Sequence, residues 1–256
     1  MPYAGSGNAT NCLQSLRAEL DEGVLTITLN SPAQGSASSG TPTMELQSLL
    51  TAVASDTDVR VVVLRDAGDE FCAAVGDGWR GRQLRQLPQP VIGMVHGHCK
   101  RGALAVLANC DIVLVSDDAQ FTLTQFDTDL LADAALARSA ASVMTPRAAR
   151  YHALSGQAFD GREAERNGLA SRSVSPAQLE QETNALAHEL AGKDAIALQF
   201  TKETLQHVGS MSWDGVLSYT AAKFAELKAL QAGRPSARAA AVEGFLAGKS
   251  KPGLGG

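Results

Sequence analysis

The segment VIGMVHGHCKRGALAVLANCDIVLVSDDAQFTL, residues 91–123, decides the fold. Its first part, with the preceding proline, predicts a buried strand over Pro90–Val95, and Ile112–Val115 predicts a second strand. Between them, Gly102–Asn109 is small and apolar throughout, which predicts a buried helix that begins at the Lys-Arg-Gly turn. Strands that alternate with helices in this way are typical of α/β folds.

The residues before this segment continue the same pattern. Leu16–Leu20 and Val24–Leu29 flank a short turn and predict a pair of strands. Apolar residues recur at helical spacing over Met44–Val53, which predicts an amphipathic helix with Thr43 as a candidate N-cap. Val59–Leu64 is rich in valine, as expected for a strand that is buried on both faces of a parallel or mixed sheet.

The residues after about Pro146 predict helices and no further strand. The expected helices are Arg147–Leu154, Gly161–Asn167, Ala177–Ala191, Ala195–His207, Asp214–Ala232 and Ala237–Leu246. Most of them are amphipathic and need a partner surface. We therefore expect three parts, namely a disordered N-terminus (1–15), an α/β core (16–195) and a C-terminal helical region (196–256).

The composition of the 256 residues excludes several classes of protein. A net charge of −5 with scattered basic residues argues against binding to nucleic acid. The apolar runs are too short to span a membrane, and the N-terminus has no signal-peptide pattern, so we expect a cytoplasmic location. Cys12, Cys72, Cys99 and Cys110 lack the spacing of a metal site or a disulfide framework, which favours buried or neutral thiols and no metal.

Three separated segments resemble the crotonase (enoyl-CoA hydratase/isomerase) superfamily. VRVVVLRDAGDEFCAAVGD, residues 59–77, resembles the strand and loop that end F-C-A-G-x-D in that family. Residues 91–123 resemble its Gly-rich second signature, and SGQAFDGREAERNGLASRSV, residues 155–174, resembles the segment that follows. The resemblance implies a spiral of ββα units with a C-terminal helical region that forms trimers, or dimers of trimers, and covers the acyl pocket.

The family resemblance also implies the substrate and an oxyanion hole. The substrate is an acyl thioester, most often an acyl-CoA, so coenzyme A enters as part of the substrate and no cofactor is permanently bound. Two backbone N–H groups stabilise the enolate oxyanion, and donors of this kind contribute on the order of 3 kcal/mol each. By position the first donor is Val75, or Gly76 if the loop holds an extra residue, and Ala73 belongs to the same substrate-binding loop. The second donor is Gly102.

The turn around the second donor departs from the family pattern. Arg101, Gly102 and Ala103 replace a run of three glycines, and Ala74 replaces the glycine of the first loop. A donor needs only a backbone N–H, so these replacements are compatible with an oxyanion hole. A helix N-terminus at Gly102 favours an anion, although small residues here also fit a purely structural role in close packing.

The family's two hydratase glutamates are absent from this sequence. Their positions hold Ala105 and Gln125, neither of which transfers a proton, so simple hydration is disfavoured. Gln125 remains a candidate substrate contact. Asp133 occupies the position where dienoyl-CoA isomerases and aryl-CoA dehalogenases carry a catalytic aspartate, which implies an acid, base or nucleophile. The alternative for Asp133 is a helix cap.

The C-terminal residues resemble those of the hydroxycinnamoyl-CoA hydratase-lyases, through Trp213, Tyr219 with Lys223, and Lys251–Leu254. The likeness implies that Tyr219 faces the phenolic end of a substrate and binds or deprotonates it during retro-aldol cleavage. The alternative is that Tyr219 is a half-buried packing residue. His98 is likewise either a polar wall of the acyl pocket or an ordinary core or surface histidine.

Arg101, Lys249 and Lys251 are candidates for contact with the coenzyme phosphates, the last two across a subunit boundary. Ser31–Ala37 lacks the basic residue that the family carries in its first loop, so coenzyme A binds weakly or the acyl group arrives on a carrier protein. Asp77–Gln89 is shorter than in relatives, which predicts a more open acyl pocket.

Together these patterns predict a lyase or isomerase that works through an enolate, with Asp133 or Tyr219 as the proton handler. Two alternatives remain open. One is a catalytically reduced homologue that binds an acyl thioester or a partner enzyme, and the other is a biosynthetic hydrolase or cyclase that uses the same oxyanion hole.

Overall fold

The computed structural model describes residues 15–30, 41–73, 81–100, 102–123 and 134–232. The chain forms two compact units, Met1–Gly192 and Lys193–Gly256. The boundary expected from the sequence, between residues 195 and 196, falls at the start of a helix of the second unit. The expected disordered N-terminus lies outside the described residues except for Ser15, and so does the expected helix Ala237–Leu246.

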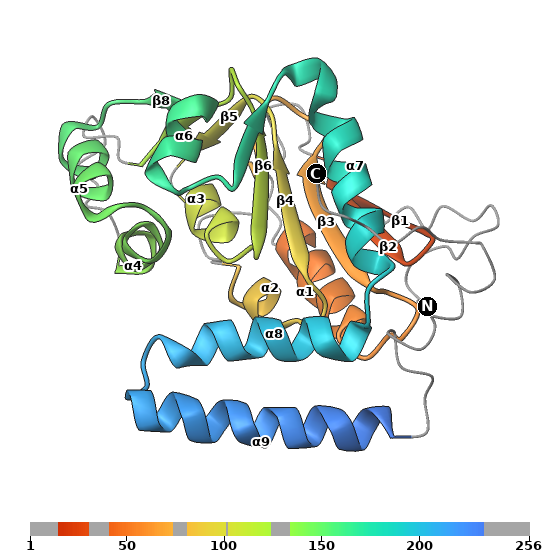
Figure 1. Cartoon of the computed structure of the whole chain (residues 1–256). Coiled ribbons are helices and arrows are strands. Elements are labelled where there is room, and N and C mark those ends of the chain that lie inside the picture. Colours follow the sequence, from red (N-terminus) through yellow and green to blue (C-terminus); the bar gives the residue numbers. More distant parts are fainter. Residues whose placement is uncertain (1–14, 31–40, 74–80, 101, 124–133, 233–256) are drawn as a thin grey trace, which may run out of the picture. The chain divides into compact units, whose positions relative to one another are not determined.

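The first unit is built on a mixed six-stranded sheet (Figure 1). Its strand order is β1-β2-β3-β4-β6-β9. The first two strands are antiparallel, and every later neighbour is parallel. The strands are β1 (Leu16–Asp21), β2 (Val24–Leu29), β3 (Val61–Asp66), β4 (Val91–Val95), β6 (Ile112–Ser116) and β9 (Arg172–Val174). The prediction of an α/β fold is confirmed, as are the positions of the first five of these strands.

A second sheet of three short strands lies in the same unit. It comprises β5 (His98–Lys100), β7 (Gln120–Thr122) and β8 (Phe159–Asp160), in the order β5-β7-β8. The prediction that no strand follows Pro146 is wrong, because β8 and β9 both lie there. Strands of two or three residues are too short to show a period-2 pattern, and pairing across long sequence separations forms them, as between Phe121 and Phe159.

The helices of the first unit are α1 (Thr41–Val53), α2 (Arg82–Gln86), α3 (Gly102–Leu107), α4 (Ala134–Val143), α5 (Pro146–Ser155), α6 (Gly161–Asn167) and α7 (Pro176–Ala191). The prediction of Thr43 as an N-cap is wrong, because the helix begins two residues earlier at Thr41. Pro42 fits there because the first turn of a helix needs no N–H from it. Neither α2 nor α4 was predicted.

Both faces of the main sheet are buried, as the valine-rich strands predicted. Val61 and Val63 pack with Leu179 and Ala187 of α7, which lies across one face (Figure 1). The intervening Val62 belongs to the larger cluster on the other face, which includes side chains of α1 and α3. Alternate residues of β3 therefore pack into two different hydrophobic cores, one on each face of the sheet. This packing fixes the ends of the strand.

The second unit contains α8 (Ala195–Val208) and α9 (Trp213–Gln231), which pack against each other. Asp194 caps α8 by accepting a hydrogen bond from Ala197 N–H at 2.8 Å, and Ser212 caps α9 in the same way. Large apolar side chains are exposed on both helices: Leu205 (72%), Trp213 (82%), Leu217 (64%), Phe224 (66%) and Leu230 (49%). None of the described helices is long and apolar enough to cross a membrane.

Candidate functional site

The two segments that lead to the candidate oxyanion donors are hydrogen-bonded to each other. Phe71 N–H donates to the carbonyl of His98 at 2.7 Å, and His98 N–H donates to the carbonyl of Asp69 at 2.6 Å. This is a parallel bridge between Glu70 and His98. The two segments therefore run in the same direction where they meet at the bridge. Val75 follows Glu70 by five residues and Gly102 follows His98 by four.

Gly97 permits the close approach of these two segments. It has φ +65°, and a Cβ at this position would overlap the carbonyl oxygen of Asp69. Its own carbonyl accepts a hydrogen bond from Gln120 N–H at 2.7 Å, which ties the turn to β7. An ion pair between Lys100 Nζ and Glu70 Oε2, at 3.0 Å, adds a side-chain contact between the same two segments. Backbone bonds, an ion pair and the absence of a side chain thus fix the turn.

The buried carboxylate of Asp66, at the end of β3, accepts hydrogen bonds from the backbone of the loop that leads to the first candidate donor. Its carboxylate accepts hydrogen bonds from Gly68 N–H at 2.9 Å and from Cys72 N–H at 3.1 Å. Asp66 is only 3% exposed, and Cys72 has a left-handed backbone with φ 58°. A non-glycine residue in that conformation is uncommon. We infer that the Asp66 carboxylate stabilises the bend at Cys72, just ahead of the candidate donor loop.

Asp66 was not predicted as a site residue. A signal was present in the sequence, because Asp66 ends a buried strand and precedes Ala67 and Gly68. An aspartate that accepts a hydrogen bond from the N–H two residues ahead forms an Asx-turn. The contact with Cys72, six residues ahead, depends on the three-dimensional path of the loop, which spacing does not reveal.

Gly102 and Ala105 lie on α3, as predicted. Gly102 is the first residue of the helix and is half-buried. Ala105 is buried with 0% exposure, and its carbonyl accepts a hydrogen bond from Asn109 Nδ2 at 2.7 Å. The first hydratase-glutamate position therefore holds a methyl group inside the core. It offers no acid or base.

Four predicted site residues are described, and three of them belong to the bridged segments. Ala73 is exposed at the end of the first loop, His98 is exposed on β5, and Gly102 begins α3. The bridge uses the backbone of His98, so a polar-wall role for its side chain stays a prediction. The fourth residue, Tyr219, lies on α9 of the second unit. The remaining candidates lie outside the described residues: Val75, Gly76, Arg101, Gln125, Asp133, Lys249 and Lys251.

Tyr219 takes part in a charged network within the second unit. Its hydroxyl donates to Glu203 Oε1 at 3.2 Å, and Lys223 Nζ contacts the same oxygen at 3.0 Å. Lys223 also contacts Glu226 at 3.1 Å and lies 4.6 Å from the centre of the Phe200 ring. Glu203 was not predicted as a partner, because it lies on a different helix from Tyr219 and no spacing rule connects the two.

This network affects the ionisation of its members. Partial burial, followed by the hydrogen bond to Glu203, raises the pKa of Tyr219 above its usual value of 10.0. The hydrogen bond to Glu203 is also the main cause that raises the pKa of Lys223. Tyr219 is therefore a neutral hydrogen-bond donor at ordinary pH rather than a phenolate base.

A cavity of about 370 Å³ lies between α8 and α9. Lys223 contributes to its lining together with Phe200, Phe224 and Leu227. The lining is mainly apolar with one cation, so it suits an apolar group that carries a polar end.

None of the three described cysteines forms a disulfide, and two of their thiols are buried. Burial raises the pKa of Cys72 and of Cys99, so both are neutral thiols, as predicted. Cys110 is half-buried, and its thiol donates to the Val106 carbonyl at 3.7 Å. Cys12 lies outside the described residues. Within the described ranges, no group of three or more His, Cys, Asp or Glu residues is placed to hold a metal ion.

Comparison with known proteins indicates the family of this chain. The family model "Enoyl-CoA hydratase/isomerase" matches residues 74–234. Hydroxycinnamoyl-CoA hydratase-lyase from Pseudomonas fluorescens is 26% identical over 94% of this chain and 95% of its own length. A peroxisomal Delta(3,5)-Delta(2,4)-dienoyl-CoA isomerase from Arabidopsis thaliana is 27% identical over 82% of this chain and 86% of its own.

Solved structures share the fold. AtuE from Pseudomonas aeruginosa superposes with a TM-score of 0.76 at 29% identity, covering 91% of this chain and 95% of its own. A protein from Mycobacterium abscessus described as a putative enoyl-CoA hydratase/isomerase gives a TM-score of 0.79 at 25% identity, covering 92% and 98% of the two chains. The similarity extends across both units of this chain.

Proposed function

Because the chain belongs to the enoyl-CoA hydratase/isomerase family, we propose that it is a lyase or isomerase that acts on an acyl thioester through an enolate. The enolate oxygen accepts hydrogen bonds from the backbone N–H groups of Val75 and Gly102. The observation that supports this proposal most directly is the parallel bridge between Glu70 and His98, which joins the two donor segments ahead of those positions. Donors that are fixed before the reaction stabilise developing charge without a reorganisation cost.

The residues available for proton transfer disfavour the usual hydration route. Ala105 is a buried methyl group and Gln125 is an amide, so neither position supplies a carboxylate. We assign the proton transfer to Asp133, which is acidic and occurs where isomerases of this family carry their catalytic aspartate. Tyr219 is a neutral hydroxyl bonded to Glu203, which favours binding of a phenolic or other polar end of the acyl group over deprotonation of it.

The direct test is a mass-spectrometric screen of enoyl, hydroxyacyl and dienoyl thioesters with aromatic and aliphatic acyl groups. We expect turnover by the natural sequence and a fall in kcat of at least about a hundredfold in Asp133→Asn. In Tyr219→Phe we expect a higher KM for phenolic substrates and little change for aliphatic ones. Turnover that neither substitution slows would overturn these roles.

A second candidate function follows from the missing glutamates. If the chain binds thioesters tightly but converts none of them, it is a catalytically reduced homologue that serves as an acyl-thioester-binding or accessory protein. Release of a free acid or of a cyclised product in the same screen would instead identify a biosynthetic hydrolase or cyclase. Each of these outcomes contradicts the lyase or isomerase proposal.

The proposal also covers the location, the oligomeric state and the coenzyme contacts of the protein. It is a cytoplasmic homotrimer or dimer of trimers that takes coenzyme A as part of its substrate, with Arg101, Lys249 and Lys251 near the phosphates. Exposed apolar side chains on α8 and α9, such as Leu217 and Phe224, support self-association through the second unit.

A further inference from the structure

Among Lys, Arg, Asp and Glu, arginine is the only residue type that occurs on α4 and α5. Residues 134–155 include Arg138, Arg147 and Arg150 but no aspartate or glutamate, in a chain of net charge −5. All three arginines are exposed. We use the name arginine surface for the exposed side chains of Arg138 on α4 and of Arg147, Arg150, Tyr151 and Leu154 on α5.

The described neighbours of the arginine surface do not pair with its charges. Among the described residues, none of its three arginines forms an ion pair, and neither does Arg82 on α2, whereas five other arginines of the first unit do. The pairs are Arg17 with Glu19, Arg65 with Glu180, Arg162 with Asp117, Arg166 with Glu163, and Arg172 with Glu182. In the part of the chain that the structure describes, α4 and α5 therefore carry three arginines without an ion-pair partner.

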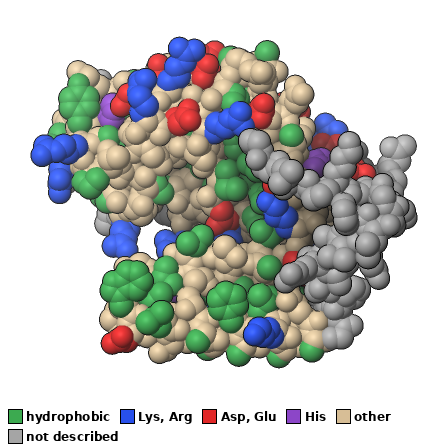
Figure 2. Space-filling model, viewed as in Figure 1, with side chains coloured by type: hydrophobic (Ala, Val, Ile, Leu, Met, Phe, Trp, Pro, Cys, Tyr) green, Lys and Arg blue, Asp and Glu red, His purple; other side chains and the backbone are tan. Residues whose placement is uncertain are grey.

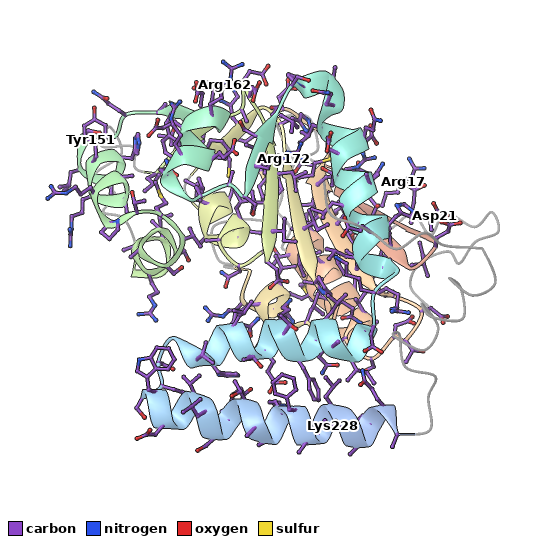
Figure 3. The ribbon with its side chains drawn as sticks, in the orientation of Figure 1. Arg17, Asp21, Tyr151, Arg162, Arg172 and Lys228 are labelled. Atoms are coloured by element: carbon purple, nitrogen blue, oxygen red, sulfur yellow. The ribbon has the colours of Figure 1, made fainter. Side chains whose placement is uncertain are left out.

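Exposed apolar side chains lie beside these arginines. Tyr151 is 54% exposed and Leu154 is 77% exposed, both on α5. Tyr151 lies at the outer edge of the first unit (Figure 3), where Figure 2 shows basic and hydrophobic side chains over α5. Tyrosine and arginine are both enriched in protein–protein interfaces, which makes this surface suitable for a protein partner.

The arginine surface is connected to the candidate site through one layer of packing. α5 packs against α4, and α4 packs against α3. α3 begins at Gly102, the second candidate oxyanion donor. A partner that docks on α4 and α5 therefore lies near the end of the first unit where the thioester carbonyl is held.

We propose that the arginine surface docks an acidic carrier protein, which delivers the acyl group as a thioester on its phosphopantetheine arm. This inference rests on the proposed function, because it names the form in which the thioester arrives. The first loop, Ser31–Ala37, lacks a basic residue for the coenzyme phosphates, whereas α4 and α5 expose three arginines that form no ion pair with any described residue. An acidic protein complements that charge, and such complementarity accelerates association and selects the partner.

Binding of a phosphopantetheine-bearing acyl carrier protein to the full chain tests the proposal. Fluorescence anisotropy is expected to show binding that weakens as salt is raised. Single charge reversals, Arg138→Glu, Arg147→Glu and Arg150→Glu, are each expected to weaken it roughly threefold to tenfold. The triple variant is expected to show no measurable binding. The matched control is Arg82→Glu, which changes an exposed arginine that also forms no ion pair among the described residues but lies on α2.

Several results would overturn the docking proposal. One is the absence of binding to the carrier protein, and another is equal binding by the natural sequence and the triple variant. A change of oligomeric state in the triple variant would assign the surface to a second copy of this chain. Arginine-dependent binding to anionic phospholipid vesicles in place of the carrier would assign it to a membrane surface.

Turnover of free and of carrier-bound substrate distinguishes a failure of the docking inference from a failure of the proposed function. We expect the triple variant to convert free acyl-CoA at the same rate as the natural sequence and to lose only the reaction with carrier-bound substrate. An equal loss of both reactions would place the arginines in coenzyme binding and contradict carrier docking. Carrier binding without turnover of any thioester would instead contradict the proposed function and leave the docking result intact.

Discussion

Gly97 lies where the two candidate donor segments meet, and its lack of a side chain has a testable consequence. Gly97→Ala would place a methyl group against the Asp69 carbonyl and would hold a non-glycine residue at φ +65°. We expect a loss of roughly 3 kcal/mol in the free energy of unfolding. Chemical denaturation followed by circular dichroism measures the change.

Gly192→Ala is the matched control for this substitution. Gly192 has a right-handed backbone, with φ −73°, and its added Cβ would lie 3.5 Å from the nearest atom, an ordinary contact. We expect no loss of stability, because alanine in a compatible conformation reduces the entropy of the unfolded chain. Equal effects at the two positions would contradict the role of Gly97 in close approach.

The hydrogen bond between Tyr219 and Glu203 gives a prediction about ionisation. Glu203→Gln removes the negative charge that helps raise the pKa of Tyr219, so that pKa should fall toward its usual value of 10.0. Ultraviolet absorbance of tyrosinate during an alkaline titration measures it, with Tyr219→Phe identifying the signal. An unchanged or higher pKa in Glu203→Gln would show that burial alone sets it.

Asp117 connects the end of β6 with α6 and β9. Its carboxylate accepts hydrogen bonds from Arg162 and from the Ser173 hydroxyl, both at 3.0 Å, and Arg162 is the main cause that lowers the pKa of Asp117 below 3.8. A lowered pKa in the folded state means that Asp117 contributes stability above pH 3.8, which is lost as the pH falls through the folded-state value.

Asp117→Asn should therefore be less stable than the natural sequence at neutral pH, and the difference should vanish as the pH falls below 3.8. Denaturation over a range of pH measures this. Asp118→Asn is the control, because Asp118 is exposed and forms no ion pair among the described residues. A difference that grew toward acid pH would contradict the assigned sign.

Elements with a strong periodic pattern could be predicted from the sequence, and short elements could not. The predictions for β2 and α6 matched their bounds, and that for α7 was correct to within one residue. α4 was missed although half of AALARSAASV is alanine, the strongest helix former. β5, β7, β8 and β9 have two or three residues and exist only through partners distant in the sequence.

The candidate site was likewise predictable from the sequence only in part. Gly102 and Ala105 could be placed on a helix because small apolar residues surround them in the sequence. The contacts of Asp66 with Cys72, and of Glu203 with Tyr219, could not be predicted, since each depends on the way the chain folds back. Local sequence patterns thus indicate candidate site residues, whereas the tertiary structure determines which other residues form hydrogen bonds with them.

At the scale of the whole molecule, the second unit exposes large apolar side chains on both of its described helices. Leu217 and Phe224 on α9 are 64% and 66% exposed, and none of the described side chains of this helix is buried. Burial of a leucine or phenylalanine stabilises an interface by about 1.5–3 kcal/mol. We expect sedimentation to give a mass near three or six times the 26.7 kDa of the chain.

Leu217→Glu and Phe224→Glu should weaken this assembly at least about tenfold each, because a charge would replace an apolar contact. Ser218→Glu adds the same charge at an exposed position that contributes no apolar area, so it should leave the mass unchanged. Circular dichroism shows whether the helices persist in each variant. A natural sequence that sediments as a single 26.7 kDa chain would contradict self-association through α9 and would leave its apolar side chains to another partner.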